Sequence, residues 1–235
     1  MKNNLSFKTR FKSGLKYFNR ILNIVILVIL IEFVQLPVIF LAKAHHPIQQ
    51  GLLILIYFAS YALLIGAAWH FYKKYHPKPL GKLTGNDIVV AIGVYVLYYF
   101  FSTAMVGLST VIFHQSQSSN NVAIQSLLSS NSLVLCVMMV GIIFLSPILE
   151  ELVFRGMIVD GLFPNAKLIW PMLVSGAAFA SAHAFSNPFL FLVYGGMGAG
   201  MVFIYRKTGT LKANIFFHML NNTLASISII IVLIK

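Results

Sequence analysis

Charged residues are scarce in this chain: Asp, Glu, Lys and Arg together make up 9% of its 235 residues, whereas a soluble domain carries roughly a quarter. Hydrophobic residues make up 59%, and the mean hydropathy is +0.86. These values exclude an ordinary soluble domain and predict a polytopic membrane protein built as one domain. Cysteine occurs once, as Cys136, so an internal disulfide and a Cys-rich metal site are also excluded.

Acidic residues are the rarest charged type, with five against 17 Lys and Arg, which gives a formal net charge of +12. The basic residues flank apolar segments and do not line a soluble face. We therefore predict a surrounding lipid bilayer and no nucleic-acid partner. The chain also lacks a Gly-Xaa-Ser-Xaa-Gly motif, a His-Glu-Xaa-Xaa-His motif and a Gly-rich phosphate loop. The common signatures of serine hydrolases, zinc proteases and nucleotide-binding proteins are thus missing.

Apolar segments long enough to cross a bilayer as helices, which takes about 20 residues, recur along the chain. Seven candidates are present: residues 21–41, 51–72, 88–113, 133–149, 168–183, 189–205 and 213–234. The predicted fold class is all-α, a polytopic transmembrane helical bundle of about seven to eight spans, with the fifth and sixth short. The segment after Pro147 either continues the fourth helix or restarts as a short helix that ends near Gly161 and Pro164.

The basic loops predict how the chain is oriented in the membrane. Lys and Arg gather in residues 1–20, 73–82 and 206–212, which we place in the cytoplasm. Residues 114–132 carry no charged side chain and are predicted to form a mobile external loop. The first apolar segment is too long for the core of a cleaved signal peptide, so we expect a retained helix. The prediction is a multi-pass cell-membrane protein with a cytoplasmic N-terminus.

Two adjacent carboxylates follow the fourth apolar segment. Glu150 and Glu151 open the run Glu-Glu-Leu-Val-Phe-Arg, and carboxylates at membrane depth usually mark a working site. Glu151 and Arg155 are four residues apart on a helix and can form an ion pair. Glu150 is rotated away by about 100° and can face a cavity instead. The alternative is an ion pair at the cytoplasmic rim with no chemical role.

Two further polar elements stand in the last third of the chain. His183 ends the sequence Phe179-Ala-Ser-Ala-His, and His218 and Asn222 share a helix face in the last apolar segment. An interfacial histidine and a hydrogen bond between helices would explain them without chemistry. Together with Glu150 they also form a complete hydrolytic set. Glu150 and His183 would deprotonate a water, and His218 and Asn222 would donate hydrogen bonds to an oxyanion.

The ordered motifs Glu-Glu-Xaa-Xaa-Xaa-Arg, Phe-Xaa-Xaa-Xaa-His and His-Xaa-Xaa-Xaa-Asn resemble the CAAX protease and bacteriocin-processing family of intramembrane proteases, also called the Abi or CPBP family. The resemblance covers residues 134–234. It implies a membrane endopeptidase with a site that opens to the cytoplasm and a peptide or membrane-protein substrate. The chain then divides into a basic cytoplasmic arm (1–20), N-terminal helices with the external loop (21–132) and a catalytic core (133–235).

The resemblance also implies a role for each motif residue. The implied catalytic residues are Glu150, His183, His218 and Asn222, and the implied supporting residues are Glu151, Arg155 and Phe179. We expect no cofactor, which leaves Glu150 available as the base and gives Asn222 a role. Relatives are described both as metalloproteases and as metal-independent glutamate proteases. The alternative is therefore Zn²⁺ held by Glu150, His183 and His218 with water as the fourth ligand.

The implied physiological role is bacteriocin self-immunity or the processing of a peptide. The rival class is a non-enzymatic immunity or scaffold protein that binds a peptide or receptor and keeps the motifs for folding. A transporter fits less well, because paired broken spans and a sequence repeat are missing. The activity of a Glu150→Ala protein would separate an enzyme from a binding protein.

Overall fold

The computed structural model describes residues 7–76, 81–183 and 186–234, and within these ranges every regular element is helical. The predicted all-α class is confirmed. The elements in chain order are α1 (Phe7–Phe33), α2 (Leu36–Leu41), α3 (Pro47–Tyr75), α4 (Gly85–Phe113), α5 (Ser119–Leu128), α6 (Ser132–Val140), η1 (Gly141–Leu145), α7 (Ser146–Glu151), η2 (Leu152–Val159), α8 (Asp160–Leu162), α9 (Ile169–His183), α10 (Pro188–Thr208) and α11 (Leu211–Ile234). The label η marks π-helical turns. The elements from α6 to α8 form one continuous helix, Ser132–Leu162, which we call the central helix.

Six helices within the described residues are long and apolar enough to cross a membrane. They are Ser13–Leu41, Pro47–Tyr75, Gly85–Phe113, Ser132–Leu162, Pro188–Thr208 and Leu211–Ile231. The predicted fifth span forms α9 instead, whose 15 residues extend about 22 Å, less than the hydrocarbon core of about 30 Å. The number of full-length spans in the described part of the chain is therefore six, and α9 is a shorter helix among them.

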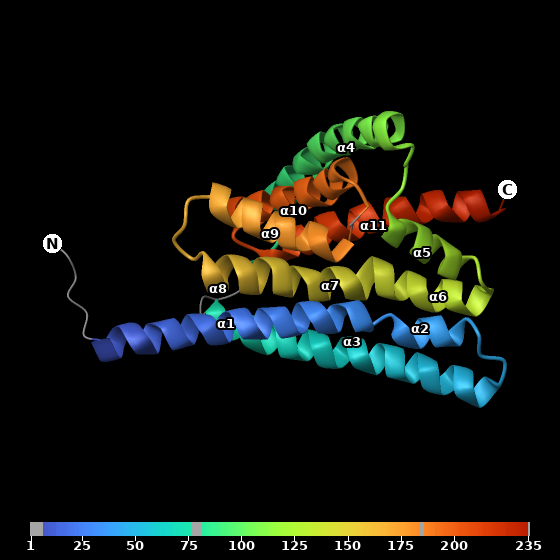
Figure 1. Ribbon diagram of the computed structural model, residues 1–235, viewed down its shortest axis with the longest axis horizontal. Helices are drawn as coiled ribbons and strands as arrows, with labels where there is room; N and C mark the ends of the chain where they lie inside the picture. The colour runs from blue at the N-terminus through green and yellow to red at the C-terminus, as the bar shows by residue number, and fades with distance from the viewer. Residues whose placement is uncertain (1–6, 77–80, 184–185, 235) are drawn as a thin grey trace.

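The helices are arranged on both sides of the central helix (Figure 1). α1, α2 and α3 lie along one side of it, and α4, α9, α10 and α11 lie on the other. Although it is short, α9 runs between the two ends of the bundle. At one end Arg206 donates to the carbonyl of Pro164, just before α9, at 3.2 Å. At the other end Asn187, just after α9, donates to Gln115 beyond α4 at 2.8 Å.

We expect cysteines placed at Ser116 and Lys207 to react from opposite sides of the membrane, because these exposed residues lie at opposite ends of the bundle. An impermeant maleimide added to intact cells should label Ser116→Cys. It should label Lys207→Cys only after the cells are permeabilised. Cys136 is exposed, so it is replaced by Ser in both variants. Labelling of both positions from the same side would contradict the predicted orientation.

The central helix continues through Pro147, the first of the two predicted alternatives, because a π-helical turn precedes the proline. In this turn the N–H of Ser146 donates to the carbonyl of Gly141, five residues earlier. With the same spacing of five residues, the carbonyl of Ile142 would accept from the backbone N–H of Pro147, but proline has no N–H. It accepts instead from Asn222 Nδ2 at 2.9 Å. Asn222 of α11 thus replaces the hydrogen bond that the proline removes.

Two segments outside the predicted spans contain helix. The predicted basic arm, residues 1–20, contributes residues 7–20 to α1. The prediction of a mobile loop at residues 114–132 is wrong in one respect, because α5 forms within it. Ser118 caps the start of α5 by accepting from the N–H of Asn121 at 3.2 Å. Ser and Asn, which resemble a loop by composition, here supply a helix cap.

Two glycines set the distance between α9 and α10. A Cβ at Gly176 would lie 2.8 Å from the carbonyl oxygen of Gly195, and a Cβ at Gly198 would lie 2.8 Å from Cα of Gly176. Gly176→Ala should therefore push the helices apart and lower the stability by about 1–3 kcal/mol. Gly93→Ala in α4 is the matched control, since its Cβ meets nothing within 4 Å. Thermal unfolding in detergent should show a lower Tm for Gly176→Ala alone, and equal Tm values would contradict close helix packing.

Candidate active site

The two predicted glutamates lie in the central helix between its two π-helical stretches. η1 ends at Leu145 and η2 begins at Leu152, so α7 presents Glu150 and Glu151 between two wider turns. Such turns are rare and occur frequently at functional sites. Both side chains are buried, Glu150 with 5% exposure and Glu151 with none. The two carboxylates differ in their hydrogen-bond partners: Glu150 is bonded to Ser146, and Glu151 is bonded to Arg155, His218 and Asn214.

Glu151 is held by three side chains, one from its own helix and two from α11. Arg155 Nη1 donates to Oε1 at 2.9 Å, which confirms the predicted ion pair. His218 Nδ1 lies 2.9 Å from the same oxygen, and Asn214 Nδ2 donates to Oε2 at 3.2 Å. Both carboxylate oxygens are therefore in use, and the buried charge is compensated. A carboxylate fixed in this way is suited to a supporting position.

Arg155 is fully buried and has further contacts beyond that ion pair. Its Nη2 donates to the carbonyl of Gly198 in α10 at 3.2 Å, and its guanidinium carbon lies 4.8 Å from the ring centroid of Phe179. Phe179 in turn stacks on His183 with centroids 4.3 Å apart and meets His218 edge-on at 5.7 Å. The predicted supporting residue Phe179 thus contacts both histidines and restricts the planes of their rings.

Glu150 has a different environment. Ser146 Oγ, four residues earlier, donates to Oε1. Oε2 is buried and has no hydrogen-bond partner among the described residues. It faces two ring nitrogens, His183 Nε2 at 3.5 Å and His218 Nε2 at 3.8 Å. One oxygen of this carboxylate is therefore anchored, and the other is available between two imidazoles.

The hydrogen bond of His183 within its own helix determines what its second nitrogen can do. Nδ1 lies 2.9 Å from the carbonyl oxygen of Phe179. A carbonyl only accepts, so Nδ1 carries the proton and Nε2 of the neutral ring is an acceptor. This acceptor faces Glu150 Oε2, a second acceptor, at 3.5 Å. Two facing acceptors suit a molecule that donates to both, and water has two protons.

Three polar side chains of α11 recur at intervals of four residues: Asn214, His218 and Asn222. This spacing places them on one face of the helix. The first two contact Glu151, and the third donates to the carbonyl of Ile142. Asn222 uses one amide proton in that bond and keeps a second. The face of α11 toward the central helix thus carries the predicted residues and one more.

Two residues of the site were not predicted from the sequence, Ser146 and Asn214. Each lies four residues before a predicted site residue, Ser146 before Glu150 and Asn214 before His218. The same four-residue rule that pairs Glu151 with its arginine applies to both. A search for polar residues at this interval around each motif would have found them.

Comparison with known proteins adds to this geometry. Residues 132–224 match the model of a family described as type II CAAX prenyl endopeptidase Rce1-like. A protein of Bacillus subtilis (strain 168) named "Putative membrane peptidase YdiL" is 30% identical over 107 residues. The aligned part covers 46% of this chain and spans 41% of the length of that relative. No solved structure matches the chain.

The resemblance to the CAAX protease family is confirmed. The matched residues, 132–224, contain all the predicted site residues as well as Ser146 and Asn214. They include the central helix, α9 and α10, whereas α1 to α5 lie outside the match. With its six candidate spans, the chain is a multi-pass membrane protein, and its CAAX-protease-like region, residues 132–224, contains Glu150.

The zinc alternative for the CAAX-protease-like region requires Glu150, His183 and His218 as ligands. Glu150 Oε2 lies 3.5 Å from His183 Nε2 and 3.8 Å from His218 Nε2. The same three residues could hold a water molecule between a carboxylate and an imidazole, so both alternatives apply to one group of side chains.

Proposed function

We propose that this protein is an intramembrane endopeptidase that hydrolyses a peptide bond of a membrane-associated peptide or protein. The observation that carries the proposal is the environment of Glu150, with one oxygen anchored by Ser146 and the other facing His183 and His218. The group lies inside the region that matches the CAAX endopeptidase family. The name of the Bacillus subtilis relative, a membrane peptidase, supports the same class of enzyme.

In the proposed reaction, Glu150 and His183 act on one water. The water donates to Glu150 Oε2 and to His183 Nε2, which orients its oxygen toward the carbonyl carbon of the substrate. Glu150 takes a proton from the water as the new C–O bond forms. The proton then passes to the leaving nitrogen as the C–N bond breaks. The products are a carboxylic acid and an amine, and Glu150 is again a carboxylate.

The proposed oxyanion hole is supplied by α11. Asn222 offers the amide proton that the Ile142 carbonyl does not use. His218 directs Nδ1 toward Glu151, so it can donate from Nε2 only as an imidazolium. Carboxylate oxygens 2.9 and 3.8 Å from its ring nitrogens would balance that charge. Donors that are in place before the oxyanion forms lower the barrier without reorganisation.

The reaction proposed here needs no metal ion, because Glu150 takes the proton itself. Purified protein should therefore contain no stoichiometric zinc, and proteolysis should survive treatment with a chelator. Elemental analysis together with a cleavage assay before and after chelation measures both. A zinc ion bound to each chain and lost together with activity in His183→Ala and His218→Ala would reverse this assignment.

The finer proposal is a role in bacteriocin self-immunity or in peptide processing, as the family resemblance implies. A non-enzymatic immunity or scaffold protein is the second candidate. One observation favours it: Glu151, Arg155 and His218 form a buried network, so motif residues also hold helices together. The two candidates differ in whether Glu150 is needed.

Mass spectrometry of membrane peptides tests the proposed function. The samples are cells that carry the wild type and cells that carry Glu150→Ala at equal expression. An endopeptidase produces peptides with new termini in the wild type alone. A scaffold gives identical peptide sets in both strains and protects both equally against a bacteriocin, which would reject the peptidase.

A further inference from the structure

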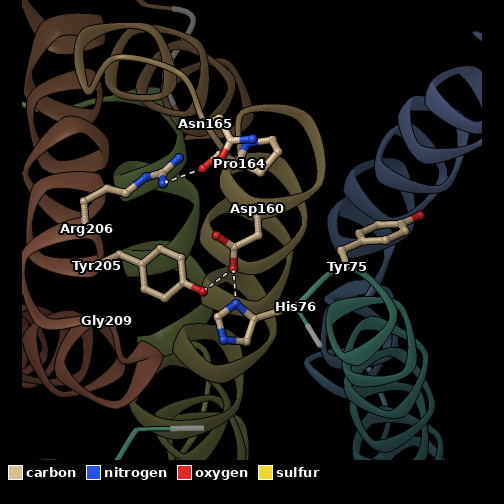
Figure 2. Close-up of a pocket in the computed structure, with 8 residues that line it drawn as sticks. All are labelled: Tyr75, His76, Asp160, Pro164, Asn165, Tyr205, Arg206 and Gly209. Carbon is tan, nitrogen blue, oxygen red and sulfur yellow. Dashed lines mark hydrogen bonds and ion pairs between the residues drawn. The ribbon is translucent and has the colours of Figure 1, made fainter. Parts of the chain in front are cut away.

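A second polar cluster lies on the central helix about 15 Å from Glu150, because Asp160 is ten positions further along. It surrounds a cavity of about 400 Å³ (Figure 2). The lining residues that matter here are Tyr75, His76, Asp160, Asn165, Tyr205 and Arg206. They come from the ends of α3, the central helix and α10, and from the segment that follows the central helix.

The cavity lies at the level where membrane-spanning helices end. Tyr75 is the last residue of α3, and Tyr205 and Arg206 belong to the last turn of α10, which ends at Thr208. Side chains at such helix ends meet the lipid headgroups, and tyrosine is enriched there. A ligand would therefore enter this cavity from the headgroup layer or from the adjacent water.

The carboxylate that lines the cavity is hydrogen-bonded to neighbouring side chains, whereas the guanidinium that lines it keeps N–H donors that are not used. Asp160 is the acidic residue of the lining, and its Oδ2 is bonded to His76 Nδ1 at 2.7 Å and to the hydroxyl of Tyr205. Arg206 donates to two backbone carbonyls after the central helix, from Nη1 and Nη2. A guanidinium has five N–H groups, so three remain. Figure 2 shows the guanidinium and the Asp160 cluster on the same side of the central helix.

The surrounding sequence adds positive charge. Lys73 and Lys74 lie in the last turn of α3, and Lys207 and Lys212 stand at the junction of α10 and α11. Arg20 of α1 also reaches this end of the central helix and donates to a backbone carbonyl there at 2.6 Å. The potential around the cavity therefore favours an anion.

We propose that this cavity binds the phosphate of an anionic phospholipid headgroup. Arg206 presents planar N–H donors that match phosphate oxygens, and Asn165 adds an amide donor. Basic pockets between membrane helices on the cytoplasmic side have the chemistry to recognise such headgroups. A bound headgroup would join the ends of α3, α10 and the helix that carries Glu150. The site is separate from the proteolytic machinery, so Glu150→Gln protein binds the lipid as the wild type does.

The test is a titration of the purified full-length protein with phosphatidylglycerol, followed by native mass spectrometry. Asn165→Glu places a negative charge beside the phosphate at an exposed residue. Arg206→Gln removes the main donor, although it also removes two bonds to the backbone. Lys207→Gln is the matched control, because it removes one positive charge from an exposed neighbour that does not line the cavity. Removing one basic group near the surface costs up to about fivefold in binding, which is the largest loss expected for Lys207→Gln. Both cavity variants should bind more weakly than Lys207→Gln by at least a further factor of about five.

Phosphatidylcholine and glycerol 3-phosphate complete the experiment. The proposal requires that phosphatidylcholine binds more weakly than phosphatidylglycerol, and that glycerol 3-phosphate at equal concentration does not displace the lipid. Unchanged lipid binding in Asn165→Glu would overturn the site even if Arg206→Gln does not fold. An equal loss in Lys207→Gln would show non-specific surface attraction, and displacement by glycerol 3-phosphate would show a site for soluble phosphates instead.

Discussion

Glu150→Gln should abolish proteolysis and leave the fold intact. Glutamine keeps the shape of the side chain and can still accept from Ser146, but a neutral amide cannot take the water's proton. Removing a general base typically lowers the rate about 10²–10⁴-fold, and we expect a loss in this range. The measurements are the cleavage rate in lipid vesicles and the Tm in detergent, which should not fall.

Glu32→Gln is the matched control for this experiment. It makes the same exchange at an exposed residue of α1 whose charge interacts with that of Glu150, so it removes a neighbouring carboxylate and leaves the proposed base in place. Its cleavage rate should stay close to that of the wild type. If Glu150→Gln cleaves as fast as Glu32→Gln, Glu150 is not the base and the water must be activated elsewhere.

Glu151→Gln should have its largest effect on stability. The exchange leaves the fully buried Arg155 without its counter-charge and weakens the bonds to His218 and Asn214. Breaking a buried ion pair from one side typically costs about 3–5 kcal/mol, which is a large part of a total stability of about 5–15 kcal/mol. The variant should insert poorly or unfold at a clearly lower temperature, as measured by yield and Tm.

Arg155→Gln should be similarly unstable, and the double variant Glu151→Gln with Arg155→Gln provides the control. It should recover part of the lost stability, because neither charge is left unpaired. Recovery remains incomplete, since the contacts of Arg155 with Gly198 and Phe179 are also lost. Strictly additive losses would mean that the two residues are not coupled. A stable, inactive Glu151→Gln together with an active Glu150→Gln would reverse the roles of the two glutamates.

The parts of the site that follow from helix periodicity could be predicted from the sequence. Glu151 and Arg155 pair as expected, because a spacing of four residues fixes the face of a helix wherever that helix lies. The same rule separated Glu150 from Glu151 and placed His218 and Asn222 together. The expectation that these elements meet at one place came from the family resemblance, because periodicity on one helix says nothing about its neighbours.

The remaining features depend on tertiary contacts that no local pattern contains. The bond from Asn222 to Ile142 exists because a π-helical turn precedes Pro147, and hydropathy does not distinguish a π turn from an α turn. The short α9 satisfies the apolar pattern of a span but lies against α10 through Gly176 and Gly198. The cavity near Asp160 combines residues from three helix ends, which are distant in the sequence.

The most direct test of the proposed mechanism is the cleavage of one peptide by the purified protein in lipid vesicles, in water labelled with oxygen-18. The substrate is a peptide that the membrane comparison identifies, and the measured quantity is the rate at which a labelled carboxyl terminus appears. Wild type and Glu32→Gln should form labelled product at similar rates in the presence of a chelator, and Glu150→Gln should form almost none. Labelled product from Glu150→Gln at the wild-type rate, or no product from the wild type until zinc is added, would contradict a water activated by Glu150 and His183.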